Sequence, residues 1–281
     1  MSDVITVELV EDSMSAVLLE IRDGIDLLEE PPWIVPDEIP GTLLWADGAD
    51  TGTIISTVDG LGAKRVSQWS DKSGLGNHLV QATGSFQPVS ELETCNGLNV
   101  LSFAPEADGG SSWLTLLHHF NSNSLSIFAV ASRKATAHGR YTASRVVSLV
   151  ADGYADWNVW VTWSPIQYTN QLNLGHQPSA TTVRENVTVA AADLTYDTAS
   201  VTSAILDGDV ITFNHMNVET SGSTSPNIID SWRMSVGCVD FAGSGGALSG
   251  WIAELIVVDR AVTALEAETI RAYLRNRWNA Q

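Results

Sequence analysis

The sequence has few basic residues: 14 Lys and Arg stand against 33 Asp and Glu, which gives a net charge of −19 at pH 7. A protein that binds nucleic acid needs a basic surface to meet the phosphates, so this balance argues against a nucleic-acid partner. It also disfavours binding to an anionic membrane surface. A large negative charge keeps a protein soluble through mutual repulsion, and it also suits bound cations.

Cysteines and long apolar segments are scarce as well. The two cysteines, Cys95 and Cys238, are far apart and lack metal-ligand spacing. We predict two buried free thiols, because a disulfide would require the fold to bring these residues together. No stretch is long and apolar enough to span a membrane, and residues 1–11 lack the basic start and apolar run of a secretion signal. We therefore expect no membrane partner.

Signatures of nucleophilic or zinc catalysis are also missing. The sequence contains no G-x-S-x-G elbow, and its six histidines have no zinc-like spacing. What the sequence does contain is a regular series of short strands and turns, which is typical of an antiparallel β-sandwich or jelly roll. The predicted strands cover residues 42–46, 66–70, 99–104, 113–117, 125–132, 145–151, 171–174, 187–190, 204–213, 232–239 and 251–258.

Two of these segments carry specific signals. Residues 125–132 (LSIFAVAS) are apolar at both alternating sets of positions, which predicts a central strand buried on both faces. Residues 204–213 (AILDGDVITF) predict a hairpin with Asp207 and Gly208 at its turn. The whole of 42–281 is therefore predicted to form one all-β domain.

A single helix is predicted after the last strand. Thr263 and Glu266 have the T-x-x-E spacing of a capping box. The apolar residues that follow predict one face that packs against the sandwich; they are Leu265, Ile270, Tyr273, Leu274 and Trp278.

The N-terminal segment has a different pattern. Residues 13–30 carry apolar side chains at alternating spacings of four and three, the seam of a coiled coil: Met14, Leu18, Ile21, Ile25 and Leu28. Isoleucine at both core positions favours states above the dimer, so we predict a homotrimer. Residues 31–41 contain four of the nine prolines and predict a stiff linker. Residues 1–30 thus read as an anchor and oligomerisation segment.

Several motifs then point to a known family. They include LLWADGAD, VSQWSDKSGLGNH, NGLNVLSFAP, LSIFAVAS and GWIAELIVVDRAVTALEAETIRAYLRNRW. In this order they resemble the concanavalin A-like (laminin G-like) jelly-roll domains of tailed-phage virion proteins and of some bacterial surface proteins, over roughly residues 41–281. The resemblance implies an antiparallel two-sheet β-sandwich, an ordered loop from Asp71 to Asn77, and display on a particle or cell surface.

The resemblance does not by itself imply catalysis, because such sandwiches host lectins, enzymes and structural modules alike. Glycosidases on this scaffold carry two carboxylates as E-x-D-x-x-E on one strand, and this string is absent here. Glu254, on the same predicted strand face as Ile252, Ile256 and Val258, is the nearest candidate but has no acidic partner on its strand. We therefore expect no enzyme, and a partly buried Glu254 held by hydrogen bonds to the turns near Asp71 or Arg260.

Two kinds of binding site remain as hypotheses. Asp47, Asp50, Asp71 and Asn77 could hold a structural calcium ion, but the same residues serve turns without metal. In the segment WNVWVTW, strand alternation sets Trp160 among polar neighbours, with Tyr154 nearby. This pair is the candidate for stacking on a glycan, with burial under a loop or a second subunit as the alternative.

The sequence thus favours a structural protein on the surface of a tailed-phage virion, as a head decoration, a head fibre or a tail fibre. Residues 1–30 would attach it to other virion proteins, and a host surface glycan would be a weak ligand. A polysaccharide hydrolase or lyase on the same fold is one alternative. A bacterial surface adhesin is another, although no secretion signal is seen.

Overall fold

The computed structural model describes residues 35–103, 112–116, 121–122, 124–134, 144–151, 159–166, 169–176, 185–190, 197–223, 229–230, 232–238 and 247–281. The coiled-coil prediction for residues 13–30 falls outside these ranges. The described part is mostly antiparallel β-structure with one C-terminal helix, as the sequence predicts.

One layer of the fold, here called the helix-side layer, is built around strand β19. Its strands are β1 (Thr42–Asp47), β6 (Leu98–Phe103), β19 (Gly250–Val258), β9 (Ser124–Arg133), β14 (Ser200–Asp207), β15 (Val210–His215) and β16 (Val218–Ser223). β19 pairs with β9 along one edge, while β1 and β6 share its other edge end to end. β14, β15 and β16 then follow β9 in order.

The second layer faces the first across the core. Its strands are β13 (Glu185–Ala190), β12 (Thr169–His176), β11 (Val159–Ile166), β10 (Ser144–Ala151), β18 (Trp232–Val236), β7 (Leu114–Leu116), β4 (Leu79–Val80), β3 (Lys64–Trp69), β2 (Ile54–Val58) and β5 (Val89–Cys95). A separate pair is formed by β8 (Asn121–Ser122) and β17 (Ile229–Asp230). Short 3-10 turns are η1 (Pro36–Glu38), η2 (Thr51–Thr53) and η3 (Gly84–Phe86).

The two layers are not separate sheets, which corrects the prediction of a two-sheet sandwich. β5 pairs with β6 of the helix-side layer and also with β3 of the second layer. The hydrogen-bonded ladder therefore continues from one layer into the other, as one curled antiparallel sheet. The β5–β6 connection is a two-residue turn at Asn96 and Gly97, both with positive φ, which is the type I′ geometry that Asn-Gly favours.

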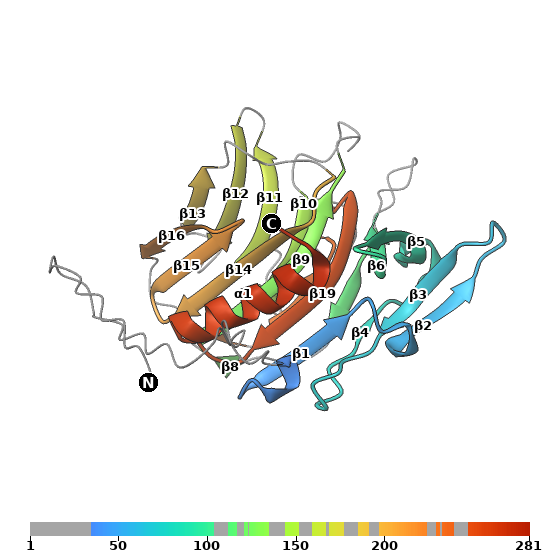
Figure 1. Ribbon diagram of the computed structural model, residues 1–281, viewed down its shortest axis with the longest axis horizontal. Coiled ribbons are helices and arrows are strands. Elements are labelled where there is room, and N and C mark those ends of the chain that lie inside the picture. The colour runs from blue at the N-terminus through green and yellow to red at the C-terminus, as the bar shows by residue number, and fades with distance from the viewer. Residues whose placement is uncertain are drawn as a thin grey trace, which may run out of the picture. The chain divides into compact units, whose positions relative to one another are not determined.

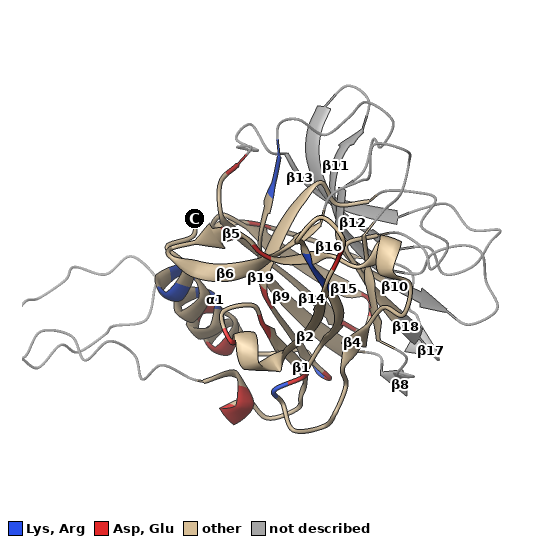
Figure 2. Ribbon diagram, turned by 90° about the vertical axis from the view of Figure 1, so that its right-hand side faces the viewer, with Lys and Arg blue, Asp and Glu red and all other residues tan. Residues whose placement is uncertain are grey.

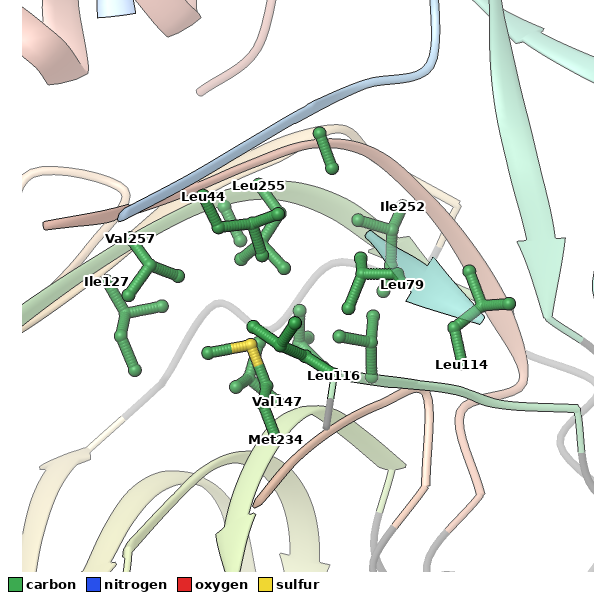
Figure 3. Packing of buried hydrophobic residues seen from close by; sticks show 14 of the residues in the cluster. Leu44, Leu79, Leu114, Leu116, Ile127, Val147, Met234, Ile252, Leu255 and Val257 are labelled. Carbon is green, nitrogen blue, oxygen red and sulfur yellow. The ribbon is translucent and has the colours of Figure 1, made fainter. Parts of the chain in front are cut away.

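The main core fills the space inside this curl. Leu44, Leu255 and Val257 from the helix-side layer face Leu116, Val147 and Met234 from the second layer (Figure 3). Burial of these aliphatic side chains stabilises the fold by about 25 cal/mol per Å² of apolar surface removed from water.

A second core lies on the other face of the helix-side layer, under α1 (Ala264–Trp278). The helix lies across β9 and β14 (Figure 1), and β9 is buried on both faces as its sequence predicts. The Thr263–Glu266 capping box is confirmed. Leu265 is an error of the prediction, since it is 78% exposed while Ala267 and Arg271 are buried.

Two smaller predictions can be compared with the structure. Cys95 and Cys238 are both buried and are not joined to each other by a disulfide, as predicted. The β14–β15 hairpin forms as predicted, but its register pairs Asp207 with Val210. The turn residues are therefore Gly208 and Asp209, one position later than predicted, with the positive φ at Gly208.

Candidate functional site

The loop from Asp71 to His78 is organised by a single carboxylate. Oδ1 of Asp71 accepts hydrogen bonds from the backbone N–H of Trp45 at 3.0 Å and of Ser73 at 2.8 Å. Oδ2 accepts from the hydroxyl of Ser73 at 2.7 Å and from the backbone N–H of Asn77 at 3.0 Å. The side chain of Asn77 donates to the carbonyl of Leu43 at 2.7 Å, which ties the loop to β1.

These contacts bear directly on the calcium hypothesis. An ionised carboxylate offers about four lone-pair sites, and all four of those on Asp71 already accept protein hydrogen bonds. Asp47 and Asp50 lie together, but with Lys72 between their carboxylates rather than an open space. Within the described ranges, no group of three or more His, Cys, Asp or Glu side chains is arranged to hold a metal. The four predicted residues therefore form two sets, one in a turn and one in an ion-pair cluster.

Asp47, at the end of β1, is fully buried and accepts three donors. Its Oδ2 is 2.8 Å from Nζ of Lys72 and 2.8 Å from the guanidinium of Arg277, and its Oδ1 accepts from the N–H of Ala49. Lys72 also pairs with Asp50 at 3.0 Å and lies over the ring of Trp45. The cluster thus links β1, the loop after β3 and the end of α1.

Glu254 lies next to this cluster and is also fully buried. Its Oε1 accepts from the indole N–H of Trp45 at 2.7 Å and from the hydroxyl of Tyr273 at 3.1 Å. Its Oε2 accepts from the indole N–H of Trp278 at 2.6 Å, with Nε of Arg277 at 3.8 Å. The carboxylate is therefore surrounded by donors from β1 and α1.

A β-bulge at Ala253 decides which way Glu254 points. Across β9, Ile252 is opposite Ala131 while Glu254 is opposite Val130, so Ala253 is an extra residue. The prediction placed Ile252 on the face of Glu254, but the bulge reverses the alternation and turns Ile252 into the main core. The carbonyl of Ala253 is satisfied by the N–H of Gly48 at 2.8 Å.

The two buried carboxylates are direct cross-strand neighbours, because Asp47 is paired with Glu254 between β1 and β19. Like charges in this position repel, and taking each of them out of water has its own cost. Burial raises the pKa of Glu254 and the Asp47 carboxylate raises it further, whereas Arg277 and the indole N–H of Trp278 lower it. Arg277 and Lys72 together supply the two positive charges that balance the pair.

This arrangement holds α1 on the sheet and leaves no path to the carboxylates. Glu254 and Asp47 have no exposed surface, and each of their oxygens accepts at least one hydrogen bond. Basic and acidic residues lie side by side along α1 (Figure 2). Among the basic residues of this helix, Arg277 is the one that pairs with the two buried carboxylates. The pair thus joins the helix to β1 and β19 through buried hydrogen bonds and ion pairs.

The sequence reasoning identified Glu254 and Asp47 separately, and missed their partners. Tyr273 and Arg277 are four residues apart on the helix and so share a face, and Trp278 follows directly. The sequence predicts apolar packing for Tyr273 and Trp278, but both also donate hydrogen bonds to the buried Glu254. A buried carboxylate needs such donors, and this need could have identified them.

The structure describes the other candidate residues only in part. Trp160 is in β11, with its backbone opposite Ser148 of β10 and Gly175 of β12. The structure describes the backbone of Trp160 but not its side chain, and Tyr154 lies outside the described residues. The five seam residues also lie outside it; they are Met14, Leu18, Ile21, Ile25 and Leu28. A membrane-spanning helix would have to be longer and more apolar than any helix in the described residues.

Comparison with solved structures identifies the fold. Domain 4 of a GH43 extracellular arabinanase from Geobacillus stearothermophilus, solved in complex with arabinotriose, matches with a TM-score of 0.56 and 13% identity, over 83% of this chain and 97% of the domain. The binding domain of botulinum neurotoxin serotype G matches with a TM-score of 0.56 and 12% identity, over 85% of this chain but only 54% of that binding domain. The likeness shows a lectin-like jelly-roll fold. The sequence matches no family model and no curated protein.

Proposed function

We propose that this chain is a lectin-like, non-enzymatic structural protein on the surface of a tailed-phage virion. Residues 1–30 attach it to other virion proteins and join three copies, and residues 42–281 face outward as a head decoration or a fibre. Residues 31–41 link the two parts, with Ile39 packed into the core of the β domain. The observation that carries this proposal is the sealed carboxylate pair. Glu254, the nearest candidate for a catalytic carboxylate, is buried with Asp47 and fastens α1, which suits a rigid display module.

Weak binding of a host surface glycan is the second element of the proposal. The solved structures that share the fold include an arabinanase domain bound to arabinotriose and a toxin binding domain, and both support a binding role. Trp160 on β11, together with Tyr154, supplies the aromatic surface on which a sugar ring would stack. Calcium is not required in this scheme, because the Asp71 loop is already held by its own hydrogen bonds.

Location in the particle tests the structural role. Antibodies against residues 42–281 should label purified phage particles, and deletion of residues 1–30 should abolish labelling without unfolding the β domain. Sedimentation of the isolated full chain should give a trimer that the same deletion converts to monomers. If the chain were found on a bacterial surface and not in purified particles, the adhesin alternative would be favoured instead.

Binding and hydrolysis are separated by one set of measurements. On a glycan array, the full chain should retain a set of glycans that the Trp160→Ala variant does not, while Leu75→Ala, at an exposed loop position, should bind like the parent. Incubation with the retained polysaccharides should release no new reducing ends. Cleavage of any polymer by the parent protein would establish the enzyme and refute the non-enzymatic role.

A further inference from the structure

Strand β2 has one free edge in the described part of the chain, where it pairs only with β3. On the side that faces β3, the carbonyls of Thr53 and Ile55 accept hydrogen bonds and the N–H of Asp59 donates one. The register shift in the β2–β3 pair places the extra residue, Ser67, on β3, so β2 keeps its alternation and the backbone groups of its even-numbered residues, Ile54, Ser56 and Val58, point away from β3. The N–H of Ile54 is taken by η2, which leaves the rest of this row open to another strand.

This edge lacks the features that normally protect free edges. Natural edge strands are blunted by charged side chains, above all Lys, or by Pro. β2 reads IISTV and carries neither. Its side chains are instead apolar and accessible, with Ile55 52% exposed, Val58 65% exposed and Leu61, at the following turn, 93% exposed. β16, which pairs only with β15 in the described residues, has the charged Glu219 at its second position.

The sequence of β2 is complementary to itself. In an antiparallel pair centred on Ser56, the Ser56 residues of two copies face each other and exchange backbone hydrogen bonds. Ile54 then lies opposite Val58 of the second copy, and Ile55 opposite Thr57. Every pair matches a β-branched residue with another or a serine with a serine, which is favourable across strands. With the N–H of Ile54 engaged, about four new hydrogen bonds form.

The charges around β2 do not oppose pairing with a second copy of this chain, which its self-complementary sequence favours. A protein of net charge −19 repels its own copies unless the contact region is neutral. The charges nearest to β2 are neutralised locally, since Arg65 pairs with Asp59 and Lys64 with Glu91. The Asp59 residues of two paired copies would be about 20 Å apart at roughly 3.4 Å per residue, well beyond the screening length of about 8 Å.

We propose that β2 is a self-association edge, through which two copies of this chain pair antiparallel about Ser56 and continue one sheet into the next. A two-fold contact of this kind is isologous and closes on itself. The contact is small, so it forms at high local concentration, such as between neighbouring copies on an assembled surface. It is independent of the coiled-coil segment and of any glycan site.

Cysteine cross-linking of the full chain tests the register. In Ser56→Cys the two new thiols face each other, with Cα atoms about 5.5 Å apart, which a disulfide can bridge. In Val58→Cys the two thiols lie about 14 Å apart along the strands, although the residue is more accessible than most. Under mild oxidation we expect severalfold more covalent dimer from Ser56→Cys than from Val58→Cys, and none from the parent, whose thiols are buried.

A lysine placed on the edge gives a second readout. Ile55→Lys, added to Ser56→Cys, should suppress the cross-link, and alone it should remove the concentration-dependent increase in sedimentation coefficient. Val218→Lys on β16 is the matched control, since Val218 is 54% exposed, and should change neither. Equal cross-linking of the two cysteine variants, no cross-linking of Ser56→Cys, or a cross-link indifferent to Ile55→Lys would each overturn the proposal.

Discussion

Replacing Arg277 by Met tests whether the buried carboxylates fasten the C-terminal helix. Met keeps an apolar stem that can pack near Tyr273 and Trp278, over which the guanidinium now lies. It removes the cation that Asp47 and Glu254 share. Breaking a buried ion pair by removing one partner costs about 3–5 kcal/mol. Because Lys72 still faces Asp47, we expect the lower end, about 3 kcal/mol at pH 8.

The loss should depend on pH with a defined sign. Folding raises the pKa of Glu254, so this group adds stability at low pH, which is lost as the pH rises through its folded pKa. Arg277 lowers that pKa, so its removal raises it further and widens the window. The destabilisation caused by Arg277→Met should therefore be smaller at pH 5.5 than at pH 8.

Urea unfolding of the full chain at both pH values measures this effect. The matched control is Arg275→Met on the same helix, whose partners Glu268 and Asn217 are at the surface, and we expect about 0–1 kcal/mol there at either pH. Equal losses for the two variants, or a loss for Arg277→Met that does not change with pH, would refute the fastening role of the carboxylate pair.

Three further predictions concern the loop, the bulge and the helix cap. Asp71→Ala should lower the free energy of unfolding by about 2–4 kcal/mol by leaving several donors unpaired, and calcium or EDTA should leave the parent melting temperature unchanged; a calcium-dependent rise would contradict our account of the loop. A Cβ on Gly48 would lie 2.7 Å from the bulge carbonyl of Ala253, so Gly48→Ala should cost about 1–3 kcal/mol, whereas Gly84→Ala, with open space around it, should be nearly neutral by the same urea assay. Arg260 and the cap lower the pKa of Glu266 to about 2. Glu266→Ala should therefore lower the free energy of unfolding by about 1 kcal/mol at pH 7. Thermal melts should show this difference between variant and parent disappearing as the pH falls through 2.

The sequence predicts the local elements of this fold well, because their causes are local. The run from Leu125 to Ser132 has apolar residues on both faces of the predicted strand, and in the structure the strand is buried on both faces. Thr263 and Glu266 are close in sequence, so their capping box is visible before folding. The Asn96-Gly97 turn was equally visible, and it could have identified β5, which the strand prediction omitted.

The candidate site was harder to predict because its geometry arises from long-range pairing. Trp45 and Glu254 are 209 residues apart in the chain, and nothing in either segment specifies the register that joins them. The bulge at Ala253 depends on how β9 and β19 align, so strand alternation alone placed Ile252 on the wrong face. Side-chain type indicated a buried carboxylate but could not indicate which donors would surround it.

The position of β1 on the edge of β19 has a consequence for how the protein folds. β1 follows directly on the linker, yet its partner strand and the helix above it are among the last segments to be synthesised. The folding nucleus must therefore form without this edge, or wait for a loop of about two hundred residues to close, which slows folding. Until then Trp45 of β1 stays uncovered, and nascent chains held close together would be most prone to misassembly at this stage.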